Sequence, residues 1–186
     1  SLSLLFFCSA QSSQFRMKHF FIVTLPSLLI ATALLHPQSA STKVKGPLTS
    51  HFQDWLNANG YAADKFPRSD YGTQGSHGGK INDEEKIVNS PVVFIHGNSD
   101  SALVAGIYSG WTHSIQYFLD HGYATVSEAE LYATSWGDVN AMKAGLRTHD
   151  CDTTRRLRRF LIAVQEYTQS EKVHVVGHSM GVTLGR

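Results

Sequence analysis

Residues 173–181 read VHVVGHSMG, and this stretch decides the fold. Its apolar, β-branched beginning is typical of a strand buried on both faces of a parallel sheet. The G-x-S-x-G pattern that follows indicates a sharp turn from the strand into a helix, with Ser179 at its tip. Gly177 and Gly181 remove the side chains that would clash where strand and helix approach each other. We therefore predict a tight strand–turn–helix that presents Ser179 to solvent.

A serine placed in this way is suited to nucleophilic attack. Its hydroxyl group is a weak nucleophile at neutral pH and needs a neighbouring base to take the proton. The backbone N–H of Met180, at the start of the predicted helix, would be the first donor of an oxyanion hole. The pattern alone has an alternative interpretation, a glycine-rich turn with an incidental serine. A second motif upstream argues against that alternative.

This second motif is a strand and glycine turn at residues 91–98, which read PVVFIHGN. Proline is tolerated at the first residue of a strand, and the apolar run after it is typical of a buried strand. The His-Gly pair predicts a loop that supplies a second oxyanion donor, the backbone N–H of Asn98. The catalytic base follows the serine in folds with this type of elbow, whereas His96 precedes it. We therefore expect His96 to brace the loop.

Between the two motifs the sequence alternates between helical and strand patterns. Residues 111–119 carry their apolar side chains on one helical face, and Gly122 is placed to end that helix. Residues 131–136 have the length and alternation of a short strand.

A longer apolar stripe over residues 157–167 predicts a second helix, with Asp152 or Thr153 as its start signal. The order of elements is therefore strand, helix, strand, helix, strand and elbow. Such alternation indicates an α/β protein with a parallel sheet.

Three stretches resemble the class 2 lipases, a family of secreted triacylglycerol lipases and esterases within the α/β-hydrolase superfamily. These stretches are residues 91–98, 130–138 and 172–183, and the resemblance covers nearly all of residues 46–186. It implies an α/β-hydrolase fold, with a mostly parallel sheet and helices on both faces. It also implies a serine esterase acting on lipid esters, with Ser179 as nucleophile and the N–H groups of Asn98 and Met180 as oxyanion donors. The family needs no metal ion or organic cofactor for this chemistry.

The sequence departs from the family's pattern after the serine. In the family an aspartate and a histidine follow downstream, and residues 180–186 contain neither. We therefore expect residues 41–186 to be the N-terminal part of a longer lipase domain, truncated after the elbow and inactive by itself. Two alternatives stay open because one fold serves many functions. They are another acyl-transfer enzyme, such as a thioesterase or acyltransferase, and a non-catalytic binding protein.

The first part of the sequence has the pattern of a leader. Residues 1–16 precede the first methionine and are interpreted as upstream sequence of doubtful origin. Residues 17–40 have the basic start, the apolar run and the small residues of a signal peptide. The apolar run spans about 16 residues and contains Pro26, short of the roughly 20 residues that a membrane span needs. We expect a secreted protein without a stable transmembrane anchor.

The charge balance argues against a nucleic-acid partner. Removing Arg16 and Lys18 from the 16 basic residues leaves 14 against 15 acidic residues, a net charge of −1 for the mature part. A nucleic-acid-binding domain is typically strongly basic. The expected partner is a lipid ester substrate at a lipid–water interface, and the sequence makes no prediction of the oligomeric state.

Two local features have more than one interpretation. The second helix carries a cluster of four arginines, Arg155, Arg156, Arg158 and Arg159. We interpret the cluster as a solvated helix face, with binding to an anionic lipid surface as the alternative. Cys151 is the one cysteine of the mature part, so it either lacks a disulfide partner from elsewhere or is a buried free thiol.

Overall fold

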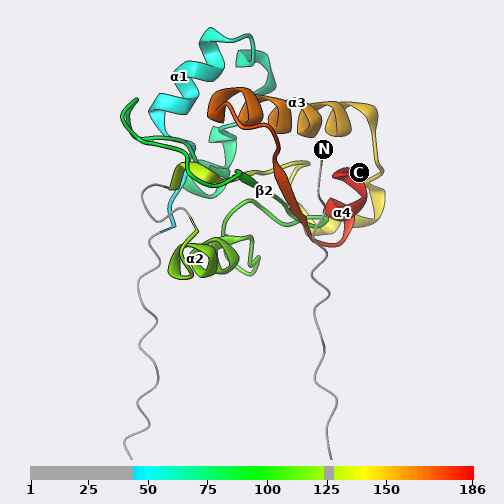
Figure 1. The fold of residues 1–186 in the computed structure, drawn as a ribbon. Helices are drawn as coiled ribbons and strands as arrows, with labels where there is room; N and C mark the ends of the chain where they lie inside the picture. The colour runs from blue at the N-terminus through cyan, green and yellow to red at the C-terminus, as the bar shows by residue number, and fades with distance from the viewer. Residues whose placement is uncertain (1–43, 124–127) are drawn as a thin grey trace, which may run out of the picture. The chain divides into compact units, whose positions relative to one another are not determined.

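The computed structural model describes residues 44–123 and 128–186. The expected leader and signal peptide, residues 1–40, lie outside this part of the chain and stay predictions. No helix within the two described ranges has both the length and the apolar character to cross a membrane. The described part consists of a small sheet with helices packed against it (Figure 1).

The sheet has four strands and is mostly parallel. The strands are β1 (Ser76–His77), β2 (Val92–Ile95), β3 (Leu131–Thr134) and β4 (His174–Gly177). Their spatial order is β1-β3-β2-β4. Strand β2 runs parallel to both β3 and β4, whereas β1 pairs with β3 in the antiparallel sense. The expected parallel α/β arrangement is therefore confirmed. Strand β1 was not predicted from the sequence, because it has only two residues.

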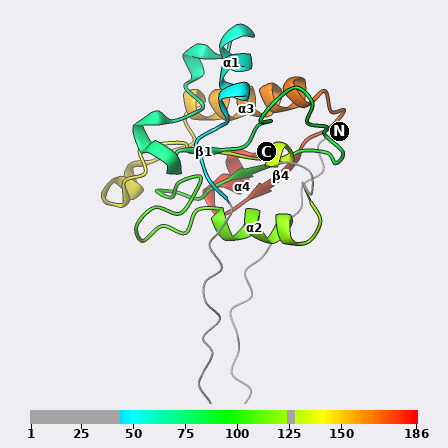
Figure 2. The ribbon, with the colours of Figure 1, turned by 90° about the vertical axis from the view of Figure 1, so that its left-hand side faces the viewer.

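Helices cover both faces of this sheet. The α-helices are α1 (Ser50–Ala58), α2 (Thr112–Asp120), α3 (Cys151–Thr168) and α4 (Met180–Leu184). Short 3₁₀ helices are η1 (Ala62–Asp64), η2 (Ser69–Gln74), η3 (Glu128–Glu130) and η4 (Ala141–Leu146). Helices α1 and α3 lie on one side of the sheet and α2 lies on the other, as both ribbon views show (Figure 1, Figure 2).

Successive side chains of β2 point to opposite faces of the sheet, and each face has its own apolar core. Val93 and Ile95 pack into a cluster with residues of α1 and α3. Val92 and Phe94 point the opposite way and pack with Ile115 of α2. All four residues of β2 are buried, as expected for a central parallel strand.

The two long helices match the expectations from periodicity, except at one start. Helix α2 is followed by Gly122, whose φ of 87° is the left-handed conformation expected of a glycine there. Helix α3 begins earlier than Asp152 or Thr153, the start signals predicted from the sequence. The carboxylate of Asp150 accepts a hydrogen bond from the backbone N–H of Thr153 (2.7 Å), so Asp150 is the cap and the helix begins at Cys151.

The arginine cluster of α3 is only partly a solvated face. Arg159 donates through Nε to both carboxylate oxygens of Asp64 (2.9 Å each). Arg156 donates through Nε to the carbonyl oxygen of Asp64 (2.6 Å) and through Nη2 to that of Lys65 (3.0 Å). These two arginines therefore fix η1 and the residue after it on α3, whereas Arg158 is exposed.

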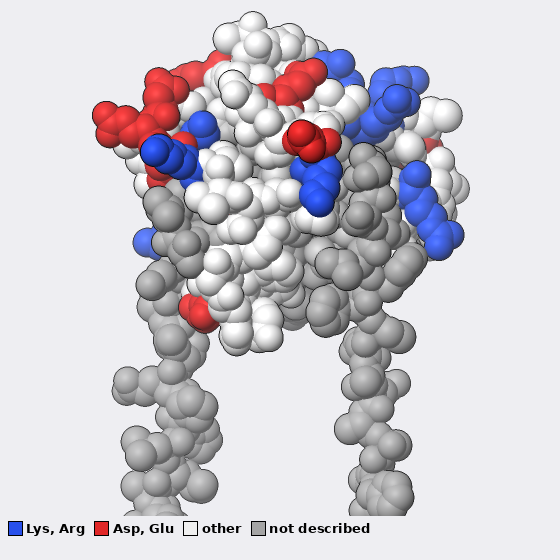
Figure 3. Space-filling view, viewed as in Figure 1, with Lys and Arg blue, Asp and Glu red and all other residues white. Residues whose placement is uncertain are grey.

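Two further observations concern the surface. The thiol of Cys151 is free and exposed, so the buried-thiol interpretation is wrong. The face of the molecule in Figure 3 carries acidic and basic side chains, with uncharged atoms between them. On this face the described residues do not form a continuous surface of one charge sign.

Candidate active site

The turn between β4 and α4 has an unusual backbone conformation at Ser179. This residue has φ 51° and ψ −124°, a conformation that costs a non-glycine residue roughly 1–3 kcal/mol. Its side chain is exposed. A serine forced into a strained turn between a parallel strand and a helix is the arrangement of a nucleophile elbow. The expected presentation of Ser179 is therefore present in the backbone geometry.

Close packing explains the glycines on either side of the serine. A Cβ atom at Gly181 would stand 2.3 Å from the carbonyl oxygen of Ile95 and 2.5 Å from that of His96. A Cβ atom at Gly177 would stand 3.0 Å from the backbone N and Cα of Val182. Helix α4 therefore lies directly against the end of β2, and only glycine at position 181 permits that approach.

The loop after β2 lies against the elbow. The N–H of His178 donates to the carbonyl oxygen of Ile95 (3.1 Å). A Cβ atom at Gly97 would stand 2.9 Å from Nδ1 of His178 and 3.2 Å from Cβ of Ser179. Asn98 follows Gly97 directly. The structure thus brings the two sequence motifs together, with the loop that contains Gly97 and Asn98 packed against the turn that precedes Met180 and α4.

His96 is locked inside this arrangement. Its ring is stacked on Trp136, with centroids 5.2 Å apart and planes 9° from parallel, and is only 1% exposed. Nε2 accepts a hydrogen bond from the N–H of Trp136 (2.9 Å), so the proton lies on Nδ1 and is donated to the carbonyl oxygen of Gly97 (2.7 Å). Burial lowers the pKa of His96 to about 4. Both nitrogens are engaged, so His96 braces the loop as expected.

The side chain of Asn98 reveals a partner that the sequence analysis missed. Its Oδ1 accepts a hydrogen bond from Nη1 of Arg147 (2.6 Å), and its Nδ2 donates to the carbonyl oxygen of Ala144 in η4 (2.9 Å). The residue after it, Ser99, has a positive φ of 65°. The connection between η4 and α3 carries no pattern that would have indicated this contact, because it depends on tertiary approach alone.

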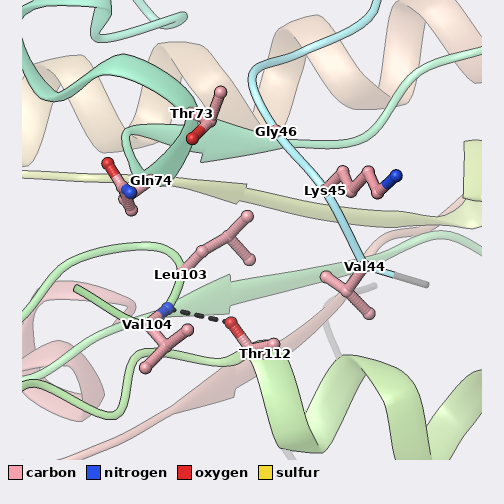
Figure 4. A pocket seen from close by; sticks show the side chains of 8 residues that line it. All are labelled: Val44, Lys45, Gly46, Thr73, Gln74, Leu103, Val104 and Thr112. Atoms are coloured by element: carbon pink, nitrogen blue, oxygen red, sulfur yellow. Dashed lines mark hydrogen bonds between the residues drawn. The ribbon is translucent and has the colours of Figure 1, made fainter. Parts of the chain in front are cut away.

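A separate cavity lies away from these residues. It measures about 270 Å³ and is open to solvent. Its lining is formed by Val44, Lys45, Gly46, Thr73, Gln74, Leu103, Val104 and Thr112 (Figure 4). On its lower side, Thr112 accepts a hydrogen bond from the N–H of Val104 (2.8 Å). No residue of the elbow or of the Asn98 loop lines it, so it is not part of the candidate site.

Comparison with models of known protein families shows which family the chain belongs to. The family model for class 2 lipases matches residues 89–186, more than half of the chain. The chain belongs to the class 2 lipase family. No curated protein matches it. The class 2 lipase match begins just before β2 and contains both the Asn98 loop and the elbow, so the resemblance seen in the sequence is confirmed. The mixed α/β architecture is consistent with an α/β-hydrolase fold.

The described residues include two histidines in the elbow or in contact with the helix that follows it. His178 is exposed within the elbow, and His149 is hydrogen-bonded through Nε2 to Thr183 of α4. In the described ranges no three His, Cys, Asp or Glu residues are grouped so that they could hold a metal ion.

Proposed function

We propose that the protein is a secreted serine carboxylic ester hydrolase of the α/β-hydrolase fold that acts on lipid esters such as triacylglycerols, in lipid catabolism. The observation that carries the proposal is the strained, exposed Ser179 between β4 and α4, with the glycine loop after β2 packed against it. Membership of the class 2 lipase family supports an ester hydrolase in general.

The proposed reaction proceeds through an acyl-enzyme. The hydroxyl oxygen of Ser179 attacks the carbonyl carbon of the ester, and its proton passes to a histidine base. The backbone N–H groups of Asn98 and Met180 stabilise the negative oxygen of the tetrahedral intermediate. The alcohol then leaves with a proton from the histidine, and water releases the fatty acid by the same steps in reverse order.

The base and its carboxylate are the parts that residues 180–186 do not contain. We propose that residues downstream of Arg186 in the complete protein supply them. One oxyanion donor contributes roughly 10²–10³ in rate. Loss of the base costs on the order of 10⁶ in kcat in a comparable triad. The sequence up to Arg186 is therefore expected to be inactive by itself, whatever the quality of its oxyanion hole.

Apolar side chains beside the Asn98 loop support a lipid substrate. Helix η4, whose Ala144 carbonyl oxygen accepts a hydrogen bond from Asn98, also carries Met142 and Leu146. Met142 is 93% exposed and Leu146 is 81% exposed. Large apolar groups at the rim of a site are suited to contact with an apolar substrate or its surface. The same side chains would suit an acyl thioester, so the preference for an oxygen ester rests on membership of the class 2 lipase family.

The test uses the complete protein and three substrates: p-nitrophenyl butyrate, emulsified tributyrin and an acyl thioester of coenzyme A. We expect hydrolysis of the two oxygen esters and its loss, by at least about 10⁴-fold, in Ser179→Ala. Ser69→Ala, which changes an exposed serine of η2, is the matched control and should retain activity. Turnover that survives in Ser179→Ala, or that is confined to the thioester, would refute the proposal.

A further inference from the structure

The connection between η4 and α3 contacts both halves of the proposed oxyanion hole. Arg147 reaches the loop of Asn98, and His149, two residues later, reaches helix α4. The two oxyanion donors come from elements far apart in the sequence, after β2 and after β4. The inference drawn from this connection rests on the proposed function, because it concerns how that site is held in place.

Arg147 is surrounded by groups that accept its hydrogen bonds. Its side chain is only 11% exposed. Nη1 donates to Oδ1 of Asn98 (2.6 Å) and to Oγ of Ser99. Nη2 donates to the carbonyl oxygen of Asn140 (2.9 Å) and forms an ion pair with Asp138. Because Asp138 balances its charge, the guanidinium group acts mainly through the direction of its hydrogen bonds.

The loop that Arg147 contacts has an unfavourable backbone conformation at one residue. Ser99 has a positive φ of 65°, which is unfavourable for a residue other than glycine. The side chain of Asn98 is fixed at both ends, by Arg147 at Oδ1 and by Ala144 at Nδ2. A side chain fixed in this way restricts the movement of the Asn98 Cα and of the backbone next to it, which carries the proposed N–H donor. Oxyanion donors must lie within a few tenths of an ångström of the ideal distance to be effective.

The second donor is held from the same connection. The hydroxyl of Thr183 donates to the carbonyl oxygen of Met180 (2.9 Å), so its oxygen accepts from Nε2 of His149. His149 therefore contacts the first turn of α4, whose N-terminal N–H is the one contributed by Met180. Arg147 and His149 therefore connect the Asn98 loop and helix α4 to the same short segment of the chain.

We propose that Arg147 is a positioning residue for ester hydrolysis, which aligns the backbone N–H of Asn98 with that of Met180 in the oxyanion hole. Arginine suits this task because its planar group presents several donors in fixed directions. Lysine offers a single charged nitrogen and cannot reach Asn98, Ser99 and Asn140 together. The role is therefore expected to depend on the guanidinium fork and not on positive charge alone.

The experiment measures kcat and KM of the complete protein with p-nitrophenyl butyrate. Active sites are counted by stoichiometric phosphonate inactivation, so that misfolded protein does not lower kcat. Arg147→Ala is expected to reduce kcat per active site roughly 10- to 100-fold with KM changed less than about twofold. Arg147→Lys should fall between Arg147→Ala and the unchanged protein. Arg155→Ala, which removes an exposed arginine paired with Asp152, is the control and should match the unchanged protein.

A second variant keeps the proposal testable if Arg147→Ala does not fold. Asn98→Ala removes the same contact from the opposite side and retains the backbone N–H. It should lower kcat per active site to a similar extent, and the double variant should be no worse than either single variant. An unchanged kcat in either single variant, or an effect on KM alone, would overturn the proposal. So would fully additive effects in the double variant.

The outcomes also separate this inference from the proposed function. An unchanged protein with no Ser179-dependent ester hydrolysis refutes the proposed function and the inference with it. An active protein whose kcat does not respond to Arg147→Ala or to Asn98→Ala refutes the inference alone.

Discussion

Gly97 and Ser179 are so close that a Cβ atom at position 97 would stand 3.2 Å from Cβ of the serine. The two residues lie at the ends of neighbouring parallel strands, and β2 and β4 pair in register up to Ile95 and Gly177. Parallel strands end at the same edge of a sheet, which is where ligands bind in folds of this class. The close approach of Gly97 and Ser179 therefore brings the two sequence motifs together in one candidate site.

Gly97→Ala should impair catalysis more than folding. The added methyl group would meet Nδ1 of His178 at 2.9 Å, and an exposed histidine ring has room to move. It would also press on Ser179 and displace the Asn98 loop from the elbow. We expect kcat with p-nitrophenyl butyrate to fall at least about tenfold, because oxyanion geometry tolerates little displacement. The urea midpoint should change by less than the equivalent of about 1.5 kcal/mol.

Gly145→Ala provides the matched control for the stability measurement. A Cβ atom at Gly145 meets nothing within 4 Å. Because alanine reduces the conformational freedom of the unfolded chain, the urea midpoint should stay the same or rise by the equivalent of no more than about 1 kcal/mol. A Gly97→Ala protein with unchanged kcat would show that the loop and the serine are not coupled in catalysis.

Gly181→Ala should damage the fold itself. Its Cβ atom would stand 2.3 Å from the carbonyl oxygen of Ile95, a backbone atom of a central strand that cannot move aside. Helix α4 would have to leave β2, which costs on the order of 3 kcal/mol or more. We expect a marked drop in the urea midpoint or failure to accumulate folded protein. A variant with unchanged stability would contradict the close approach of α4 to β2.

The sequence predicted most of the elements that build this site. Strand β2, helix α2 and the elbow follow from periodicity and from glycines whose role is local. The start of α3 was misplaced because Asp150, Asp152 and Thr153 are all acceptable start signals, and only the hydrogen bond from Asp150 to Thr153 distinguishes them. Strand β1 was missed because two residues are too few to show alternation.

The supporting contacts of the site were beyond sequence reasoning for a different reason. Arg147 and His149 lie in a connection without periodicity, and their partners Asn98 and Thr183 are distant in the chain. Likewise, Arg156 has the sequence pattern of an exposed helix face, yet it donates to carbonyl oxygens of the segment before η2. Such contacts are set by how the helices pack on the sheet, which no local pattern encodes.

His96 should make the stability of the protein depend on pH. Burial lowers its folded-state pKa to about 4 from the unfolded value of 6.5. Between these values the unfolded state binds more protons than the folded state, so stability falls as the pH drops from 6.5 towards 4. His77, fully buried with its pKa also lowered to about 4 by burial, acts in the same direction. Each should contribute a slope of up to about 1.4 kcal/mol per pH unit.

Urea unfolding between pH 4.5 and 7.5 measures this slope. In His96→Gln, whose amide oxygen can still accept from the N–H of Trp136, the slope should be smaller by roughly the share of one histidine. His113→Gln, on the exposed face of α2, controls for the substitution. A slope that is the same in His96→Gln as in the unchanged protein would mean that His96 does not titrate on unfolding.

The arginine cluster of α3 offers a comparison between two arginines on one helix. Arg156 donates to the carbonyl oxygens of Asp64, Lys65 and Ser135, whereas Arg158 is exposed. Burial lowers the pKa of Arg156 to about 10, so it remains charged at neutral pH. Arg156→Ala leaves three carbonyl oxygens without this donor and should lower the free energy of unfolding by about 2–3 kcal/mol. Arg158→Ala should change it by less than about 0.5 kcal/mol.

The same pair tests the alternative that the cluster binds an anionic lipid surface. The measurement is sedimentation with vesicles of phosphatidylcholine that contain about 30% phosphatidylserine, an anionic lipid. The fraction of protein that sediments should be the same for Arg158→Ala and the unchanged protein. Arg156 and Arg159 are occupied by η1 and the residue after it, which leaves few free cations on this face of α3 for lipid. If Arg158→Ala markedly weakened sedimentation while leaving the urea midpoint unchanged, the cluster would have a lipid-binding role in addition to its structural one.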